Sequence, residues 1–345
     1  MFYQIELLLL LLFYLCQFIN GEFKHSKKKL SENFEVPQIN PGKVQFVVKP
    51  GDFLELSKLS KEENDELQKI CGKTNFKTQN FKVSLGARAF PGQFPWVIAL
   101  GEGSAYCSGT IISSRHIITA AHCISDYESK QVPCGGPRIV TDPSKLKISY
   151  GGVCLRSYED LCPNGRDMKI AKIRKIMLPQ HFNDMLCDSG ADLAIIELEE
   201  DLMFNERTKP ICIGYFKSDG RLYDLGFGRD ENDNQVPNLR FIEVNYNKNA
   251  PRYGNILTRP KYPLPYGMKQ PGMCNGDSGG PFQINIGSPI RSFLHGVHSF
   301  GGKCAASTRD HSNTNILFYI EWICERTGIC RKWKETEIEK NVVNM

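Results

Sequence analysis

From residue 83 to about residue 318 the chain repeats one pattern, in which short apolar runs are separated by turns rich in Gly, Pro, Asn and Asp. Examples of these runs are WVIAL, GTIISSRHIIT, LAIIELEE, LRFIEVNY and SFLHGVHSF. Runs of this length are typical of strands, and their regular spacing is typical of a β-sandwich or a β-barrel. The sequence therefore predicts an all-β fold for most of the chain.

Two helices are predicted at the borders of this pattern. Ser60 and Glu63 stand at the spacing of a capping box, which indicates a short helix that ends near Cys71. The apolar residues of segment 315–326 indicate a C-terminal helix. The polar, proline-interrupted residues 22–56 predict a leader with little structure, and residues 331–345 predict a charged tail.

The first residues of the chain resemble a targeting segment. The apolar core that begins with Leu7 is too short for a comfortable membrane span, and Gly21 is a small residue at a plausible cut. We therefore expect a signal peptide over residues 1–21 and a secreted, extracellular protein with no membrane contact after cleavage. Because Glu6 stands where basic residues are usual, an uncleaved anchor remains the alternative.

The cysteines and charges limit the classes of function. The chain has 13 cysteines, and loss of Cys16 with the signal peptide would leave an even set, as in an oxidised, secreted protein. There is no CxxC pair, and His295 and His298 fall in a strand-like segment where side chains three apart face opposite ways. We expect neither a metal site nor a cofactor. The net charge of +5 is spread over mixed-sign segments, so we expect no nucleic-acid partner.

The segment CNGDSGGP raises the possibility of a reactive serine at Ser278. A serine hydroxyl is a poor nucleophile at neutral pH, and it needs a histidine base that a buried carboxylate orients. TAAHC supplies His122 at the end of one apolar run, and DLAIIEL supplies Asp192 at the start of another. Taken singly, each of these residues fits an ordinary core or turn position. Three residues in the order His, Asp, Ser, each in its own motif, favour a catalytic triad.

These motifs resemble the chymotrypsin/trypsin-like serine protease family, and the resemblance runs from about residue 83 to residue 323. It also includes PGQFPWVIAL, CSGT, SFGG and a Trp-Ile pair in the closing helix. The resemblance implies two antiparallel six-stranded β-barrels, at about residues 83–205 and 206–330, with the active site in the cleft between them. It further implies a propeptide over residues 22–82 and a protease domain over residues 83–330.

The resemblance also assigns roles to the motif residues. Ser278 is expected to be the nucleophile, His122 the general base and then acid, and Asp192 the residue that fixes the imidazole tautomer. The backbone amides of Gly276 and Ser278 are expected to form the oxyanion hole. Ser299 matches the serine that supports the buried aspartate.

Three disulfides are expected from the same resemblance, a fourth is expected only as a local pair among the remaining cysteines, and the others stay open. The expected pairs are Cys107–Cys123, Cys71–Cys212, Cys274–Cys304 and, as a local pair, Cys324–Cys330. Cys71 precedes the expected cut, so its bond would tether the propeptide. Cys134, Cys154, Cys162 and Cys187 allow three connectivities.

The resemblance leaves the specificity pocket less determined than the triad. Its expected lining is Gly272, Met273, Ser299, Gly301 and Asp310. With Gly272 at the pocket floor, where trypsin-like members have an aspartate, we favour a small or medium apolar residue before the scissile bond. Asp310 and His311 fall where the back wall should be, and the alternative is that a carboxylate there recruits Lys or Arg.

Activation is expected to follow a cut between Lys82 and Val83. Counting back from PGQFPW puts the new N-terminus at Val83, although VSLG departs from the usual two hydrophobes and two glycines. The freed ammonium would pair with Asp277. Because an apolar pocket would cut poorly after Lys82, a separate trypsin-like activator is implied.

The sequence thus predicts a secreted serine endopeptidase that is made as a zymogen and acts on protein or peptide substrates, with protein inhibitors as further partners. The alternative is a catalytically silent protease homologue that binds a partner. An adhesion module, the third hypothesis, does not explain the order of the triad residues.

Overall fold

The computed structural model describes the following residues: 44–48, 55–75, 86–124, 142–156, 162, 164–179, 182, 190–215, 220–230, 232–247, 254–265, 268–301, 304 and 310–331. All of them belong to the larger of two compact units, Val36–Met345. The smaller unit, Met1–Glu35, lies outside the described residues, and with it the predicted signal peptide. The cut site at Lys82 and Val83 also lies outside them.

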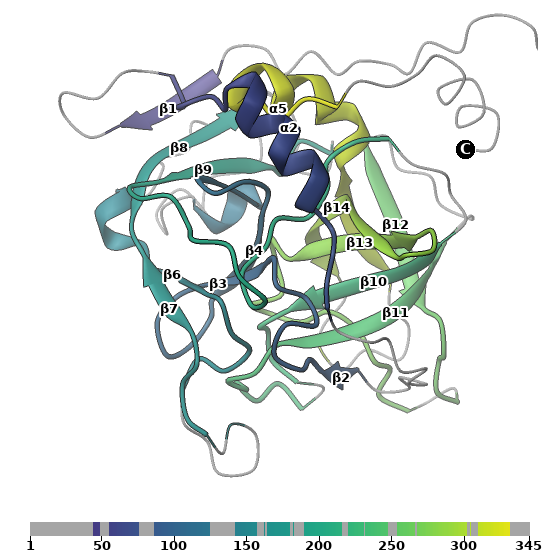
Figure 1. Cartoon of the computed structure of the whole chain (residues 1–345). Helices are drawn as coiled ribbons and strands as arrows, with labels where there is room; N and C mark the ends of the chain where they lie inside the picture. Colours follow the sequence, from purple (N-terminus) through teal and green to yellow (C-terminus); the bar gives the residue numbers. More distant parts are fainter. Residues whose placement is uncertain are drawn as a thin grey trace, which may run out of the picture. The chain divides into compact units, whose positions relative to one another are not determined.

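The first half of the larger unit forms an eight-stranded antiparallel sheet that curls as a half-barrel (Figure 1). Its spatial order is β1-β8-β9-β5-β4-β3-β6-β7. The strands are β1 (Val44–Val48), β3 (Val97–Leu100), β4 (Cys107–Ile111), β5 (His116–Thr119), β6 (Ile148–Tyr150), β7 (Lys169–Ala171), β8 (Ile173–Pro179) and β9 (Ala194–Leu198). Every residue of β3, β4, β5 and β9 is buried, which makes these strands the core of the sheet.

The second half forms a closed six-stranded antiparallel barrel, because β10 pairs with β11 as well as with β13. Its order is β10-β13-β14-β15-β12-β11, and the short strand β2 is added to β11. The strands are β2 (Ala87–Arg88), β10 (Arg221–Gly226), β11 (Arg240–Tyr246), β12 (Asn255–Pro260), β13 (Pro281–Ile286), β14 (Arg291–Gly301) and β15 (His311–Asn315). The indole N–H of Trp96, beside β3, donates to Gln283 of β13 at 2.8 Å and joins the two halves.

Both predicted helices are present. Helix α2 (Lys61–Ile70) begins at the predicted capping box, in which Ser60 and Glu63 each accept from the other's backbone amide. At the C-terminus a 3₁₀ turn (Ile316–Tyr319) leads into α5 (Ile320–Thr327). The all-β fold with a C-terminal helix is therefore confirmed.

The leader contains more structure than its composition indicates, which corrects the sequence analysis. Strand β1 pairs along its whole length with β8, so part of the expected unstructured leader extends the first sheet. Farther on, the buried carboxylate of Glu197 in β9 accepts from the amide and the hydroxyl of Ser57 at 2.8 and 2.9 Å. The Leu59 amide donates to Thr327 of α5 at 2.8 Å. The sheet and the closing helix thus give this segment hydrogen-bond partners that its own sequence does not indicate.

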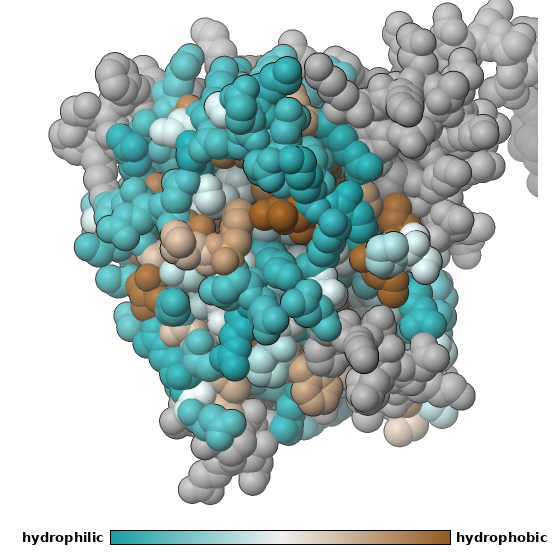
Figure 2. Space-filling model, in the orientation of Figure 1, coloured by the Kyte–Doolittle hydropathy of each residue, from teal (hydrophilic) through white to brown (hydrophobic). Residues whose placement is uncertain are grey.

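The surface on the side of α2 is mostly hydrophilic. In the space-filling view, hydrophobic residues occur there only in small, separate patches (Figure 2). Scattered apolar patches of this kind are normal for a soluble protein and do not by themselves mark an interface.

Three of the four expected disulfides are formed, namely Cys71–Cys212, Cys107–Cys123 and Cys324–Cys330. A further bond joins Cys154 to Cys162, whereas Cys134 and Cys187 lie outside the described residues.

The expected bond between Cys274 and Cys304 is not formed, which corrects the sequence analysis. The Cys274 sulfur instead lies 3.9 Å from the carbonyl oxygen of Cys304 and 3.5 Å from that of Asp230. The two cysteines are therefore neighbours, but the sulfur of Cys274 is directed at backbone carbonyls.

Candidate active site

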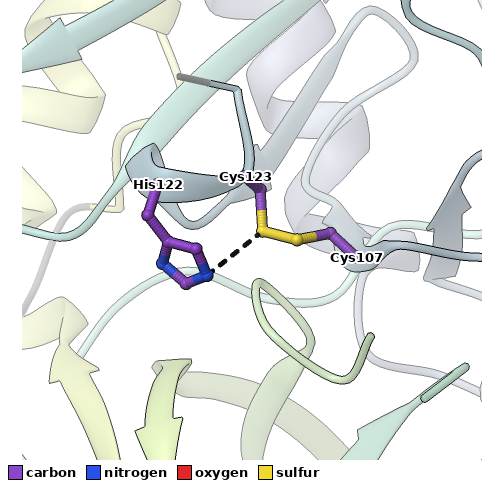
Figure 3. Close-up of side chains that lie close together, drawn as sticks. All are labelled: Cys107, His122 and Cys123. Carbon is purple, nitrogen blue, oxygen red and sulfur yellow. Dashed lines mark hydrogen bonds between the residues drawn. A yellow bond between two sulfur atoms is a disulfide. The ribbon is translucent and has the colours of Figure 1, made fainter. Parts of the chain in front are cut away.

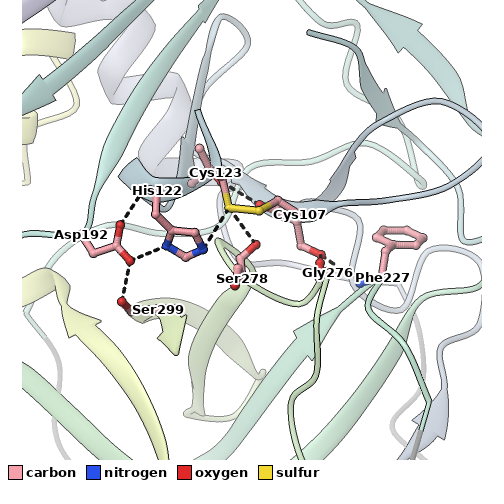
Figure 4. The surroundings of a disulfide bond; sticks show 10 residues. Cys107, His122, Cys123, Asp192, Phe227, Gly276, Ser278 and Ser299 are labelled. Atoms are coloured by element: carbon pink, nitrogen blue, oxygen red, sulfur yellow. Dashed lines mark hydrogen bonds and ion pairs between the residues drawn. A yellow bond between two sulfur atoms is a disulfide. The ribbon is translucent and has the colours of Figure 1, made fainter. Parts of the chain in front are cut away.

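The three predicted catalytic residues converge from both halves of the fold. His122 lies in a single 3₁₀ turn (Ala121–Cys123) that follows β5, and Asp192 lies two residues before β9. Because β5 and β9 are hydrogen-bonded neighbours, these two residues reach the same end of the first sheet. Ser278 precedes β13 of the barrel. Figure 4 shows Asp192, His122 and Ser278 next to one another in that order.

Asp192 is buried and fully engaged with its neighbours. Its Oδ2 lies 2.7 Å from Nδ1 of His122 and accepts from the hydroxyl of Ser299, while Oδ1 accepts from the His122 amide at 2.9 Å. Burial opposes ionisation of Asp192, but the His122 charge and these hydrogen bonds outweigh it and hold the pKa of the carboxyl below its usual value. An ionised Asp192 keeps the proton of neutral His122 on Nδ1 and leaves Nε2 able to accept one.

The His122 ring is partly exposed. The His122 side chain is 33% exposed, compared with 5% for Asp192. Within the described residues, no hydrogen bond joins the Ser278 hydroxyl to Nε2 of His122, which lies 3.7 Å from the sulfur of Cys123. Such bonds are often long without substrate, so the arrangement is compatible with a nucleophile and its base.

The loop before the serine takes a shape that only glycine adopts readily. Gly276 has φ +97°, and a side chain there would meet the backbone of Gly228 at 3.0 Å. Gly279 has φ +82°, and a Cβ there would meet Thr119 at 2.1 Å. Among the hydrogen bonds of the described residues, the amides of Gly276 and Ser278 donate to no protein group. Both amides are therefore available to a ligand.

Ser108 supports this loop, and the sequence analysis assigned it no role. Its hydroxyl donates to the carbonyl of Gly276 and accepts from the amide of Phe227, both at 2.9 Å. Its own amide donates to the carbonyl of Ser278 at 2.7 Å. The signal was present in the motif CSGT, but only the fold shows that this serine faces the oxyanion loop.

The sulfurs of Cys107 and Cys123 lie close to the His122 ring, in a cluster that by atom type alone could bind a metal (Figure 3). Both sulfurs are joined to each other in a disulfide. Thiolates are the form that binds metal, so the two sulfurs form a covalent cross-link beside the predicted catalytic histidine.

Of the residues predicted to line the specificity pocket, Met273 and Gly301 both lie against His311. Gly272 lines the cavity beside Asp277, and Ser299 donates to Asp192. Asp310 is paired with Arg259. Its carboxylate accepts from Nε of Arg259, and from Nη2 of the same residue at 3.3 Å. The buried residue between the predicted walls is His311, whose Nε2 accepts from the Met273 amide at 3.2 Å. The alternative in which Asp310 recruits a basic substrate residue is therefore not supported by this geometry.

Asp277, the expected partner of the new N-terminus, borders a cavity. The lining includes Gly86, Gly228, Arg240, Met273 and Asp277. The Asp277 carboxylate accepts from the amides of Gly228 at 2.8 Å and Cys274 at 2.7 Å. Burial raises the pKa of Asp277 to about 6 despite these bonds.

Comparisons with known proteins agree with this geometry. The family model described as Trypsin matches residues 83–323. Coagulation factor IX of Oryctolagus cuniculus is 29% identical over 253 residues, which cover 69% of this chain and 82% of that protein. Coagulation factor IX of Cavia porcellus is 28% identical over 257 residues, or 70% of this chain and 80% of that protein.

A relative whose name describes it as a transmembrane protease matches as well. Transmembrane protease serine 9 of Rattus norvegicus is 29% identical over 275 residues, which cover 77% of this chain but only 24% of that protein. Among the described residues, no helix has the length and apolar character needed to cross a membrane. The match of the Trypsin model over most of the chain, together with the fold and the three converging side chains described above, shows that this chain belongs to the trypsin family of serine proteases.

Proposed function

We propose that the protein is a secreted serine endopeptidase that hydrolyses peptide bonds through an acyl-enzyme on Ser278. The observation that carries the proposal is the ordered set Asp192, His122 and Ser278, in which a buried Asp192 lies 2.7 Å from Nδ1 of a partly exposed His122. A silent homologue has no chemical reason to keep the whole set.

In the proposed reaction, His122 removes the Ser278 proton as the hydroxyl attacks the substrate carbonyl, and it then donates that proton to the leaving amine. Asp192 holds the imidazole in the required tautomer and stabilises the imidazolium. The amides of Gly276 and Ser278 stabilise the oxyanion, and losing one such donor typically costs about 3 kcal/mol. In the second half of the reaction, His122 takes a proton from water as the water attacks the acyl group, and it then returns that proton to the departing Ser278 oxygen.

We also propose that the protein is made as a zymogen. A buried carboxyl at Asp277 with a raised pKa, at the wall of a cavity, supports a site prepared for a cation. Gly86 lines the same cavity and stands three residues after Val83 in the sequence, so a chain end at Val83 can reach Asp277. Before the cut, Asp277 would lack that ammonium and the oxyanion loop would be less firmly held.

A trypsin-like activator is implied, because the cut would follow Lys82. The bond between Cys71 and Cys212 spans the cut, so the propeptide would stay attached. Protein substrates, the activator and protein inhibitors are the proposed partners.

The experiment for catalysis is digestion of a peptide library by the precursor after brief treatment with trypsin and removal of the trypsin. The wild type should generate new cleavage products, and Ser278→Ala should generate none. Equal digestion by both would rule out the proposed nucleophile, and no digestion by the wild type would favour the silent homologue.

The experiment for activation uses the same precursor with Lys82→Gln as the matched control. Trypsin should create a new N-terminus at Val83 and switch on activity in the wild type but not in Lys82→Gln. The two fragments should separate on a gel only after reduction. Full activity in the uncut chain would contradict the zymogen proposal.

A further inference from the structure

His311 stands between the two walls of the predicted specificity pocket. It opens β15 and pairs in register with Gly301 of β14, which forms one wall. On the other wall, the amide of Met273 donates to His311 Nε2 at 3.2 Å. A Cβ placed on Gly301 would lie 3.7 Å from His311 Cδ2, so the ring lies in contact distance of both walls. The His311 side chain is 0% exposed.

A second residue holds the ring in this place. Asp224 of β10 is also 0% exposed, and its Oδ2 lies 3.2 Å from His311 Nδ1. Because the Met273 amide can only donate, Nε2 is the acceptor, and the proton of the neutral ring is on Nδ1, where it can donate to Asp224. Thr258 donates to the same carboxylate oxygen at 3.1 Å. A swing of the ring out of the pocket would leave a buried carboxylate without its histidine, so the ring is fixed.

We propose that His311 fills the specificity pocket and restricts the residue before the scissile bond to glycine or alanine. This deepens the proposed endopeptidase function and rests on it. A substrate side chain that enters between Met273 and Gly301 would meet the imidazole, and protein interiors at this packing density do not yield to an extra ring or branched chain. The preference is narrower than the small or medium apolar class expected from Gly272, because that expectation placed His311 at the back wall without assigning its ring a volume inside the pocket.

A second buried histidine, His298, lies beside His311, and a change in its charge does not open the pocket. His298 of β14 is buried, its ring centre lies 6.0 Å from that of His311, and burial lowers its pKa to about 4. It therefore stays neutral at physiological pH and adds bulk behind the pocket.

The test is a series of peptide substrates for the trypsin-cleaved protein that differ only in the residue before the scissile bond, namely Gly, Ala, Val, Leu and Phe. For the wild type, kcat/KM should be at least about 100-fold higher for Ala than for Leu or Phe, because a filled pocket excludes the larger side chains. His311→Gly should raise kcat/KM for Leu and Phe at least about tenfold. Added imidazole should refill the space and restore the wild-type order.

Two further variants separate this effect from general damage. His311→Asn shortens the side chain but keeps an N–H for Asp224, and it should also shift the preference toward larger residues. His116→Ala removes a buried histidine of the first sheet that has no part in the pocket, and it should leave the order of substrates unchanged.

The wild-type series alone carries the test if no His311 variant folds. Efficient cutting after Leu or Phe by the wild type would overturn the pocket proposal while the endopeptidase function stands. A wild type that cuts none of the series and whose Ser278 does not react with a fluorophosphonate would overturn the endopeptidase function, and the pocket proposal with it.

Discussion

The molecule contains two Asp–His pairs of similar geometry in very different surroundings. Nδ1 of His122 lies 2.7 Å from Asp192, and Nδ1 of His311 lies 3.2 Å from Asp224. The difference is at the other nitrogen: the side chain of His122 is 33% exposed, whereas His311 is fully buried and its Nε2 already accepts from a backbone amide. In the proposed mechanism, an Asp–His pair by itself therefore does not make a base, because Nε2 must also be free of a backbone amide. Among the described residues, the contact of His122 Nε2 is with the disulfide sulfur of Cys123 at 3.7 Å.

The largest expected difference between the two Asp–His pairs is in the effect on kcat of changing each aspartate to asparagine. Asp192→Asn should lower kcat of the cleaved protein about 10⁴-fold on an alanine substrate, because the imidazole is held in the wrong tautomer. Asp224→Asn should lower it less than about tenfold, since that pair shapes the pocket and moves no proton. Steady-state kinetics of both variants give the comparison, and equal losses would mean that the two pairs do not differ in role.

Asp277 is a third buried carboxyl that can be compared with Asp192 and Asp224. Its hydrogen bonds come from the backbone amides of Gly228 and Cys274 rather than from a histidine ring. Burial raises its pKa from 3.8 to about 6, so between these values the folded precursor binds more protons than the unfolded chain. Its contribution to stability should therefore be greatest below pH 4 and fall by about 3 kcal/mol as pH rises to 6. Urea unfolding of the uncut precursor measures this, with Asp277→Asn as the reference.

The fall in stability should be much smaller in the cleaved protein, because an ammonium paired with Asp277 would favour the charged form. The same pH dependence in cut and uncut protein would speak against that pairing.

A smaller effect is expected from the hydroxyls that support each pair. Ser299 donates to Asp192, and Thr258 donates to Asp224 at 3.1 Å. Ser299→Ala should lower kcat about tenfold, because a hydrogen bond to a charged group contributes about 1.5 kcal/mol. Thr258→Val is close in shape and should lower the free energy of unfolding by about 1–3 kcal/mol with less than about a twofold change in kcat. Steady-state kinetics and urea unfolding measure the two effects. A large loss of kcat in Thr258→Val together with an unchanged kcat in Ser299→Ala would contradict the roles given to the two pairs.

The three residues of the proposed triad could be singled out from the sequence because each lies in its own local motif. TAAHC, DLAIIEL and GDSGGP specify both the reactive side chain and the backbone around it. The supporting role of Ser108 could not be derived in this way, since it depends on which strand faces the oxyanion loop.

The pocket was harder to predict because its contents depend on contacts between distant parts of the chain. Asp224 and His311 are 87 residues apart, and only the register of β14 with β15 brings the ring between Met273 and Gly301. Strand β1 could not be predicted for the same reason, because it forms by pairing with the distant strand β8 and its own composition does not indicate a strand. Three of the four expected disulfides are formed, and the Cys274–Cys304 bond is not.

The rate at which Ser278 reacts with a fluorophosphonate is the most direct measurement of the catalytic role of the His122 pair. Peptide mapping by mass spectrometry should place the adduct of the trypsin-cleaved wild type on Ser278, and His122→Ala should slow the labelling at least about 10³-fold, since the base is lost. His116→Ala, which removes a buried histidine outside the cleft, should label at the wild-type rate. An adduct on another residue, or equal labelling of wild type and His122→Ala, would contradict the assignment of His122 and Ser278 as base and nucleophile.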